Sequence, residues 1–146
     1  MLTVIIDART QAAKLPALLA QLTAGAVDGL VRQVLIVAGT GQAGIEALCD
    51  ETGAEAYAAL DAAATAARAE WLMVLPADFR LRDGWISTLS GHVDRGPALI
   101  RGLADGGLFA RRSFGVLVER ARVAGVLGAD LKGLRRGLGF NPRRTG

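Results

Sequence analysis

The stretch that decides the fold reads Glu70-Trp71-Leu72-Met73-Val74-Leu75-Pro76-Ala77-Asp78. Its apolar run is short enough for a fully buried strand. Pro76 has no backbone N–H to donate to a sheet and predicts the end of that strand. Asp78 follows two residues later, so its carboxylate is expected at the carboxyl end of a central strand. Because ligands bind at that edge of open α/β sheets, the stretch also predicts where a site would lie.

Two other apolar runs, over residues 2–6 and 33–37, predict parallel neighbours for strand 71–75. Helices are expected over residues 12–22, 43–52 and 61–69, with a short strand at 55–57. This alternation predicts βαβ crossovers. The expected class is therefore α/β, with a mainly parallel sheet and helices on both faces.

The second half of the chain predicts shorter elements. A helix is expected over residues 85–93, followed by short strands at 98–100 and 108–110. From Ser113 the pattern predicts an amphipathic helix, whose inner face would carry Phe114, Leu117, Val118 and Ala121. A last short helix is expected over 131–136, with Asp130 as its N-cap, and then a tail from 141 to 146.

Composition limits the class of protein. The chain has 146 residues, 51% of them hydrophobic, which suits a single domain over residues 1–146. Cys49 is the single cysteine, so an internal disulfide is excluded and a reducing, cytoplasmic compartment is expected. Met1 leads directly into a strand rather than a signal peptide. No apolar run reaches the roughly 18 residues of a membrane span.

Charge is distributed unevenly along the chain. Residues 1–110 carry 8 Lys and Arg against 12 Asp and Glu, whereas residues 111–146 carry 9 against 2. A basic segment of this kind suggests a phosphate, a membrane surface or a nucleic acid as partner. A basic amphipathic helix from Ser113 would make weak contact with anionic membranes, which would place the protein peripherally at a membrane. A solvated end is the alternative, and we do not expect nucleic acid as the partner.

A glycine-rich turn, Gly39-Thr40-Gly41-Gln42-Ala43-Gly44, matches the G-x-G-x-x-G pattern between a strand and a helix. With Asp61 as a ribose-binding acid, it would form a dinucleotide site for NAD or NADP. The turn follows the second strand instead of the first, and Asp61 reads as the start of a helix. A turn that lets the strand and helix pack closely is the alternative.

Several segments together resemble one known family. The opening Val4-Ile5-Ile6-Asp7-Ala8-Arg9-Thr10-Gln11 resembles the VIIPAYNE motif of family 2 glycosyltransferases, and residues 33–41 resemble their EVIVVDGGS motif. Residues 66–78 are similar to AARGEWLLFLDAD, and residues 107–112 to GALFRR. Residues 129–136 are similar to the acidic EDLDLSRR segment. The resemblance covers most of the chain, in the family's order.

The resemblance implies a GT-A fold that binds a nucleotide-diphosphate sugar through an Asp-x-Asp element and a divalent metal, Mg²⁺ or Mn²⁺. Asp78 would bind that metal, and Asp130 would be the catalytic base that deprotonates the acceptor hydroxyl. Lipid-linked or saccharide acceptors are implied in the same way. The nucleotide-binding residues that the resemblance implies are Ala8, Thr10, Gly39, Thr40, Asp78, Arg111, Arg112 and Arg135.

The chain departs from the family pattern mainly at acidic positions. Pro76 stands at the first acid of Asp-x-Asp, and Ala38 stands where the family has a base-contacting acid. Ala43 stands where the family has a second acid later in that turn. Next to Asp130, Ala129 also stands where the family has an acid. A single carboxylate can still hold Mg²⁺ together with phosphate oxygens. The alternative is a glycosyltransferase-like domain that has lost catalysis and has a binding role.

Overall fold

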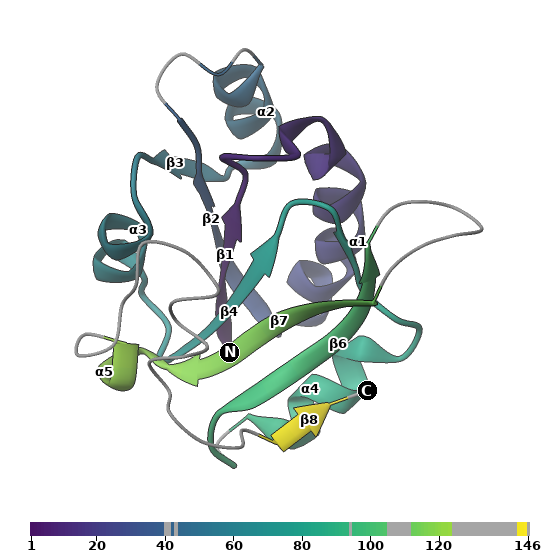
Figure 1. The fold of residues 1–146 in the computed structure, drawn as a ribbon. Coiled ribbons are helices and arrows are strands. Elements are labelled where there is room, and N and C mark those ends of the chain that lie inside the picture. The colour runs from purple at the N-terminus through teal and green to yellow at the C-terminus, as the bar shows by residue number, and fades with distance from the viewer. Residues whose placement is uncertain (40–41, 43, 94, 105–111, 124–142, 146) are drawn as a thin grey trace.

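The computed structural model describes residues 1–39, 42, 44–93, 95–104, 112–123 and 143–145, and its strands form one mixed sheet (Figure 1). The strand order is β3-β2-β1-β4-β7-β6-β5, and β8 pairs with β6 beside this path. The strands are β1 (Leu2–Asp7), β2 (Val31–Val37), β3 (Glu55–Tyr57), β4 (Trp71–Pro76), β5 (Phe79–Arg80), β6 (Ala98–Ala104), β7 (Arg112–Glu119) and β8 (Arg143–Thr145). The helices are the 3-10 turn η1 (Ala12–Lys14), α1 (Leu15–Asp28), α2 (Ile45–Thr52), α3 (Leu60–Ala66), α4 (Trp85–His92) and α5 (Arg120–Val123).

The first half of the sheet is parallel. β1 lies between β2 and β4, with Ile5 opposite Leu35 on one side and Val74 on the other. β3 adds to the outer side of β2, also in parallel. On the other side of β4, β7 and then β6 pair antiparallel. Because parallel strands end at the same edge, the carboxyl ends of β1, β2 and β4 lie together.

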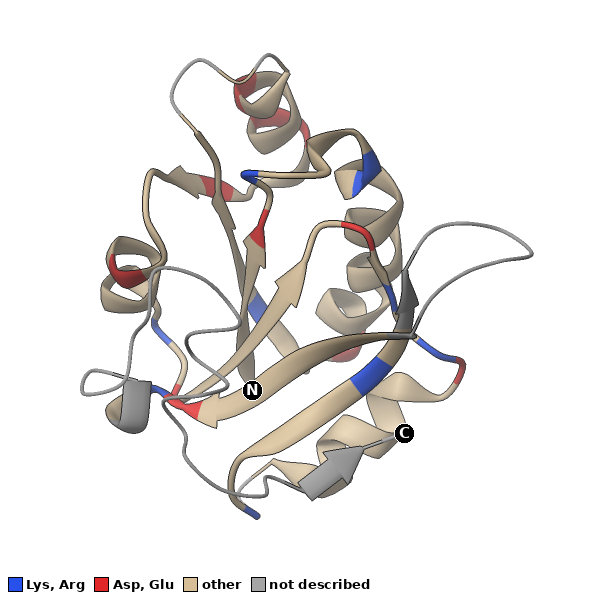
Figure 2. Cartoon of the chain, in the orientation of Figure 1, with Lys and Arg blue, Asp and Glu red and all other residues tan. Residues whose placement is uncertain are grey.

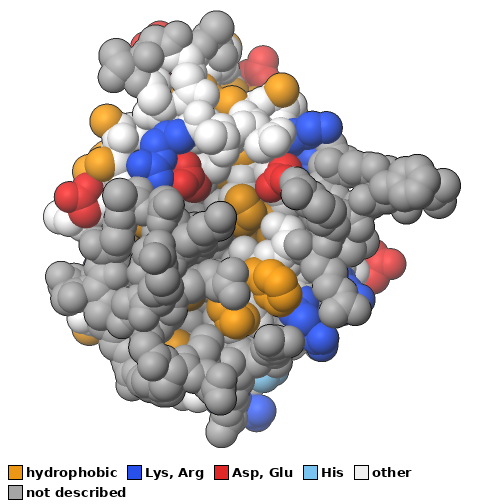
Figure 3. Space-filling view, viewed as in Figure 1, with side chains coloured by type: hydrophobic (Ala, Val, Ile, Leu, Met, Phe, Trp, Pro, Cys, Tyr) orange, Lys and Arg blue, Asp and Glu red, His pale blue; other side chains and the backbone are white. Residues whose placement is uncertain are grey.

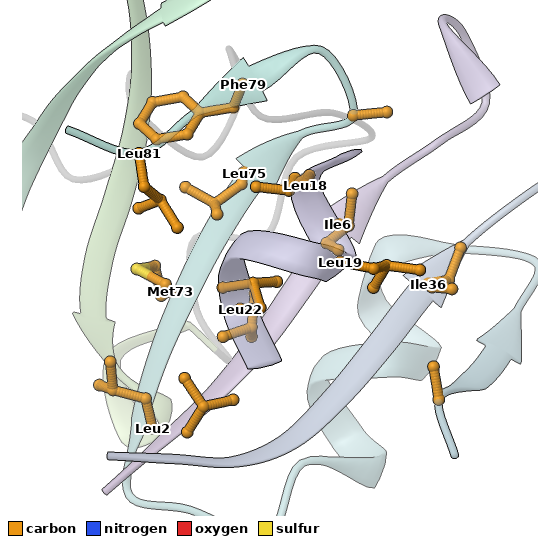
Figure 4. Packing of buried hydrophobic residues seen from close by; sticks show 14 of the residues in the cluster. Leu2, Ile6, Leu18, Leu19, Leu22, Ile36, Met73, Leu75, Phe79 and Leu81 are labelled. Carbon is orange, nitrogen blue, oxygen red and sulfur yellow. The ribbon is translucent and has the colours of Figure 1, made fainter. Parts of the chain in front are cut away.

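Helices cover both faces of the sheet. The leucine stripe of α1 (Leu15, Leu18, Leu19 and Leu22) is buried against Leu2 and Ile6 of β1 and Met73 and Leu75 of β4 (Figure 4). Helices α2 and α4 add Ile45 and Leu89 to the same cluster. On the opposite face, Leu60 and Ala63 of α3 pack with Ile5. Because side chains alternate along β1, those on one face of the sheet join one core and those on the other face join the second core.

The structure confirms the α/β class and the three parallel strands at residues 2–6, 33–37 and 71–75. It extends α1 to Asp28, where Gly29 ends the helix with a φ of 92°, a left-handed conformation that favours glycine. It adds the two-residue strand β5, which the sequence did not predict. It also places β8 where a tail was expected. The expected strand 108–110 and helix 131–136 lie outside the described residues.

The amphipathic helix expected from Ser113 is wrong. Residues 112–119 form β7, which pairs between β4 and β6. Val116, Leu117 and Val118 are all buried, because both faces of the sheet are covered there. A short apolar run of this kind fits a strand buried on both faces as well as it fits a helical stripe. The membrane-binding face predicted on this helix is therefore not formed by residues 112–119.

Across the described part of the chain, no helix combines the length and apolar character needed to cross a membrane.

Candidate functional site

Three strand ends form one polar edge of the sheet. Backbone pairing continues one residue past the strands: the Ala8 N–H donates to the Val37 carbonyl (2.8 Å), and the Ala77 N–H donates to the Asp7 carbonyl (3.2 Å). Ala38 and Ala77 are buried, so the chain leaves the sheet only after them. The first residues able to meet a ligand are therefore those that follow, among them Gly39 and Asp78.

Asp78 lies in the tight turn between β4 and β5. Its neighbours Ala77 and Phe79 are buried, whereas Asp78 itself is half-buried. Among the described residues, no hydrogen bond or ion pair occupies its carboxylate. A second acidic residue, Asp7, lies at the end of β1, next to the turn that follows β4 (Figure 2). Asp78 thus remains available to a ligand at this edge.

The turn that carries Asp78 is anchored to α1 and to η1. The Gln21 side-chain amide donates to the Leu81 carbonyl (3.1 Å) and accepts from the Leu81 N–H (2.8 Å). The Arg80 guanidinium donates to the Lys14 carbonyl (2.9 Å), at the end of η1, and to its neighbour Phe79 (2.6 Å). These bonds fix the segment that directly follows Asp78, which holds that side of the turn in place.

Asp7 and Arg9 form a bidentate ion pair at the end of β1. Arg9 donates through Nε to Oδ1 (3.0 Å) and through Nη2 to Oδ2 (2.8 Å), and its backbone N–H also reaches Oδ1 (3.2 Å). The side chains are 32% exposed for Arg9 and 18% for Asp7. Neither residue is among the site residues predicted from the sequence. The signal was present, because Asp7 replaces the proline of the motif that the opening resembles.

Gln42 bridges the ends of β1 and β2. Its Nε2 donates to the Ala8 carbonyl (3.1 Å), and its Oε1 accepts from the Gly39 N–H. Gln42 is half-buried, while Gly39 is exposed. This residue was also missed as a site residue, because a glutamine inside a glycine-rich turn carries no signal of its own in the sequence.

The structure brings together part of the expected nucleotide site. Ala8, Thr10, Gly39 and Asp78 all lie at the carboxyl edge, Ala8 buried and Thr10 exposed. Arg112 opens β7, which runs antiparallel to β4 and so begins toward the same edge. Outside the described residues lie Thr40, Arg111, Asp130 and Arg135.

The dinucleotide hypothesis does not fit the structure. Asp61, its ribose-binding acid, lies in the first turn of α3 instead of at a strand end. It is exposed and accepts a hydrogen bond from the Ala62 N–H (2.8 Å). Gly44 precedes α2 with a φ of 83°, which supports the turn as a conformational requirement.

For a divalent metal, the described residues offer few ligands. They contain no group of three or more His, Cys, Asp or Glu side chains placed to hold an ion. The Asp7 carboxylate is engaged by Arg9, which leaves Asp78 as the available carboxylate among the described residues at this edge. This donor set fits a Mg²⁺ or Mn²⁺ ion whose remaining ligands are phosphate oxygens and water. It does not fit a metal held by protein ligands alone.

The space-filling view shows the surroundings of this edge. Acidic and basic side chains border a hollow, and hydrophobic side chains lie at its floor (Figure 3). Two titratable groups with shifted pKa values lie to the side, on the α2–β3 segment. The hydrogen bond from Tyr57 to Glu55 (2.9 Å) raises the pKa of the tyrosine, and burial raises the pKa of Cys49. The edge itself combines cationic, anionic and backbone groups over an apolar floor.

Comparison with known proteins identifies the fold. No protein-family model and no curated protein matches the chain. Among solved structures, glucosyl-3-phosphoglycerate synthase from Mycobacterium tuberculosis, in complex with Mn²⁺, UDP and glucosyl-3-phosphoglycerate, matches with a TM-score of 0.64 at 13% identity, over 99% of this chain and 69% of that one. 2-C-methyl-D-erythritol 4-phosphate cytidylyltransferase from Thermus thermophilus matches with a TM-score of 0.59 at 14% identity, over 96% and 86%.

A nucleotidyl transferase from Methanothermobacter is also similar, with a TM-score of 0.58 at 12% identity over 100% of this chain and 86% of that one. At these identities the likeness concerns the fold alone. The chain has a GT-A-like nucleotide-binding α/β fold, the architecture that these glycosyltransferase and nucleotidyltransferase structures share. The fold expected from the sequence is thereby confirmed.

Proposed function

We propose that this protein transfers a sugar from a nucleotide-diphosphate sugar to an acceptor hydroxyl, in the manner of the family 2 glycosyltransferases that its sequence resembles. One observation carries the proposal: Ala8, Gly39 and Asp78 follow three neighbouring parallel strands and meet at the carboxyl edge of the sheet. That edge is the ligand-binding edge of open α/β sheets. A structural neighbour has been solved with UDP and Mn²⁺ bound.

In this proposal the nucleotide lies across the ends of β1 and β2, against Ala8, Thr10, Gly39 and Thr40. Asp78 would hold a Mg²⁺ or Mn²⁺ ion, and that ion would neutralise negative charge on the leaving diphosphate. Further positive charge against the phosphates comes from Arg111, Arg112 and Arg135. We assign the base to Asp130, which takes the proton of the acceptor hydroxyl as the glycosidic bond forms and the nucleoside diphosphate leaves.

A second candidate is a domain that binds a nucleotide without transferring a sugar. It is favoured by the scarcity of free carboxylates: Pro76 stands where an acid is expected, and Arg9 occupies Asp7. A turnover assay distinguishes the two candidate functions. Release of nucleoside diphosphate from a sugar nucleotide, dependent on an added acceptor, supports the transferase. Binding without release in a broad acceptor screen supports the binding domain.

The site is tested by calorimetric titration of UDP, GDP and dTDP, with and without Mn²⁺. We expect the wild type to bind at least one of them more tightly with Mn²⁺. Asp78→Asn should remove most of this Mn²⁺-dependent part, because it removes the negative charge that the ion needs. Asp83→Asn is the matched control, an exposed carboxylate five residues away on the same segment. Equal loss in both variants, or no nucleotide binding by the wild type, would overturn the proposal.

A further inference from the structure

At the carboxyl ends of β1 and β2, a side chain interrupts the backbone pairing of the two strands. The ladder continues through the Ala8 N–H and the Val37 carbonyl. In a parallel ladder the next bond would join the Gly39 N–H to the Ala8 carbonyl. Instead, both groups bind the side chain of Gln42, one to each end of its carboxamide. A planar carboxamide therefore lies in the ladder where the two strands separate.

The polarity of this arrangement is fixed by the backbone. The Gly39 N–H can only donate and the Ala8 carbonyl can only accept, so the Gln42 oxygen faces β2 and its nitrogen faces β1. The strand ends thus offer one donor and one acceptor to a flat group that carries a C=O and an N–H on the same carbon. Uracil, thymine and guanine each present this lactam edge, with its carbonyl beside a ring N–H.

Resting on the proposed function, we propose that the Gly39 N–H and the Ala8 carbonyl recognise the lactam edge of a nucleobase, and that Gln42 occupies this position when no nucleotide is bound. The base then displaces the Gln42 side chain and takes over both hydrogen bonds. Gln42 is half-buried and is held at its tip by these two bonds, so it can leave without disturbing a core.

Displacement has a measurable consequence. A site that is open only in a fraction of molecules binds with an affinity reduced by that fraction. Removing Gln42 should therefore tighten the binding of a lactam-bearing nucleotide, by about three- to tenfold if the side chain occupies the position most of the time. Pyrophosphate and N3-methyl-UDP should gain nothing, because neither has a lactam that can both accept from the Gly39 N–H and donate to the Ala8 carbonyl.

The experiment compares the wild-type chain with Gln42→Ala by calorimetry in Mn²⁺. The ligands are UDP, GDP, N3-methyl-UDP, ADP, CDP and pyrophosphate. We expect a lower Kd in Gln42→Ala for UDP or GDP, and no change for pyrophosphate or N3-methyl-UDP, which has lost the N–H. Gln11→Gly is the control: it removes an exposed glutamine at this edge, at a φ of 61° that glycine tolerates, and should leave each Kd unchanged.

A second readout follows the side chain itself. In ¹H–¹⁵N spectra, the Gln42 NH₂ signals are assigned by their absence in Gln42→Ala, and we expect saturating UDP or GDP to shift them. UDP and GDP binding that is unchanged or weaker in Gln42→Ala would overturn this inference and leave the proposed function standing. An equal gain for N3-methyl-UDP, ADP or CDP would overturn the lactam assignment. Absence of nucleotide binding in both proteins would overturn the inference and the proposed function together.

Discussion

Gly102 of β6 is a residue for which the structure leaves no room for a side chain. A Cβ there would lie 2.5 Å from the Arg80 carbonyl oxygen and would collide with the Phe79 ring. Gly102→Ala should therefore destabilise the fold by about 1–3 kcal/mol through overpacking. Urea denaturation would measure the change.

Gly91 in α4 is the matched control for that substitution. Apart from the backbone of α4 and the two neighbouring residues, no atom of the described residues lies within 4 Å of where a Cβ would stand. Gly91→Ala should be neutral or should stabilise by about 0.5–1 kcal/mol, as alanine does in a helix. Equal effects of the two substitutions would contradict the packing of β5 against β6.

Cys49 in α2 gives a prediction about pH. Burial, and then the negative charges of Asp50 and Glu46, raise the pKa of its thiol above the usual value. At a given pH the thiolate fraction is therefore lower than in an unperturbed cysteine, and reaction with a disulfide reagent should be slower and should accelerate toward higher pH. Asp50→Asn should lower the pKa and speed the reaction. Glu51→Gln, which removes a charge that does not act on Cys49, should leave the rate unchanged.

Individual site residues could be predicted where they follow a strand. Asp78 was found because an apolar run, a proline and an acid appear in that order, and Ala8 and Gly39 were found through the resemblance. Gln42 was missed, because its role depends on where two strand ends separate. Arg9 was missed although Asp7 stands where the family has proline, because the residue types alone do not show that the two side chains pair. The contacts of Gln42 and Arg9 depend on backbone geometry, which residue types alone do not define.

Helix α1 and the turn after β4 act as one support through Gln21. Gln21→Ala would leave the N–H of buried Leu81 without its partner, at a cost of about 1–3 kcal/mol. It should also raise the hydrogen-exchange rate of the Leu81 amide, because the turn loses its anchor. Hydrogen exchange with mass spectrometry measures this. Thr23→Ala is the control in the same helix, since the Thr23 hydroxyl bonds only within α1, to Leu19. A Leu81 exchange rate unaffected by Gln21→Ala would show that the anchor is unimportant.

Elements of the parallel half could be predicted, whereas β7 could not. Strands β1, β2 and β4 are apolar runs separated by helices, a pattern with one reading. Residues 113–121 fit a buried strand as well as a helix. The helix was predicted because Phe114, Leu117, Val118 and Ala121 have helical spacing. The choice is decided by partners far away in sequence: Met73 lies opposite Leu117, and Leu72 opposite Val118. The spacing carries no information about such partners.

For the molecule as a whole, a single domain remains a prediction. Trp71 lies in β4 and Trp85 in α4, so tryptophan fluorescence reports on the sheet and on a covering helix, while far-ultraviolet circular dichroism reports on all helices. In a single cooperative domain the two signals should give the same urea midpoint. Separate transitions would contradict this prediction. Repeating the measurement with Trp85→Phe isolates the signal of Trp71.

Strand order also has consequences during synthesis on the ribosome. One edge of β4 pairs with β1, which has already been made. The other edge stays unpaired until β7, which ends at Glu119, has been made. At about 5–20 residues per second, the 43 residues from the end of β4 to the end of β7 (residues 77–119) take several seconds to translate. During that time a hydrophobic strand presents an open edge, the kind of surface that recruits other chains. Nascent chains halted between β4 and β7 should therefore depend on chaperones more than chains halted beyond β7.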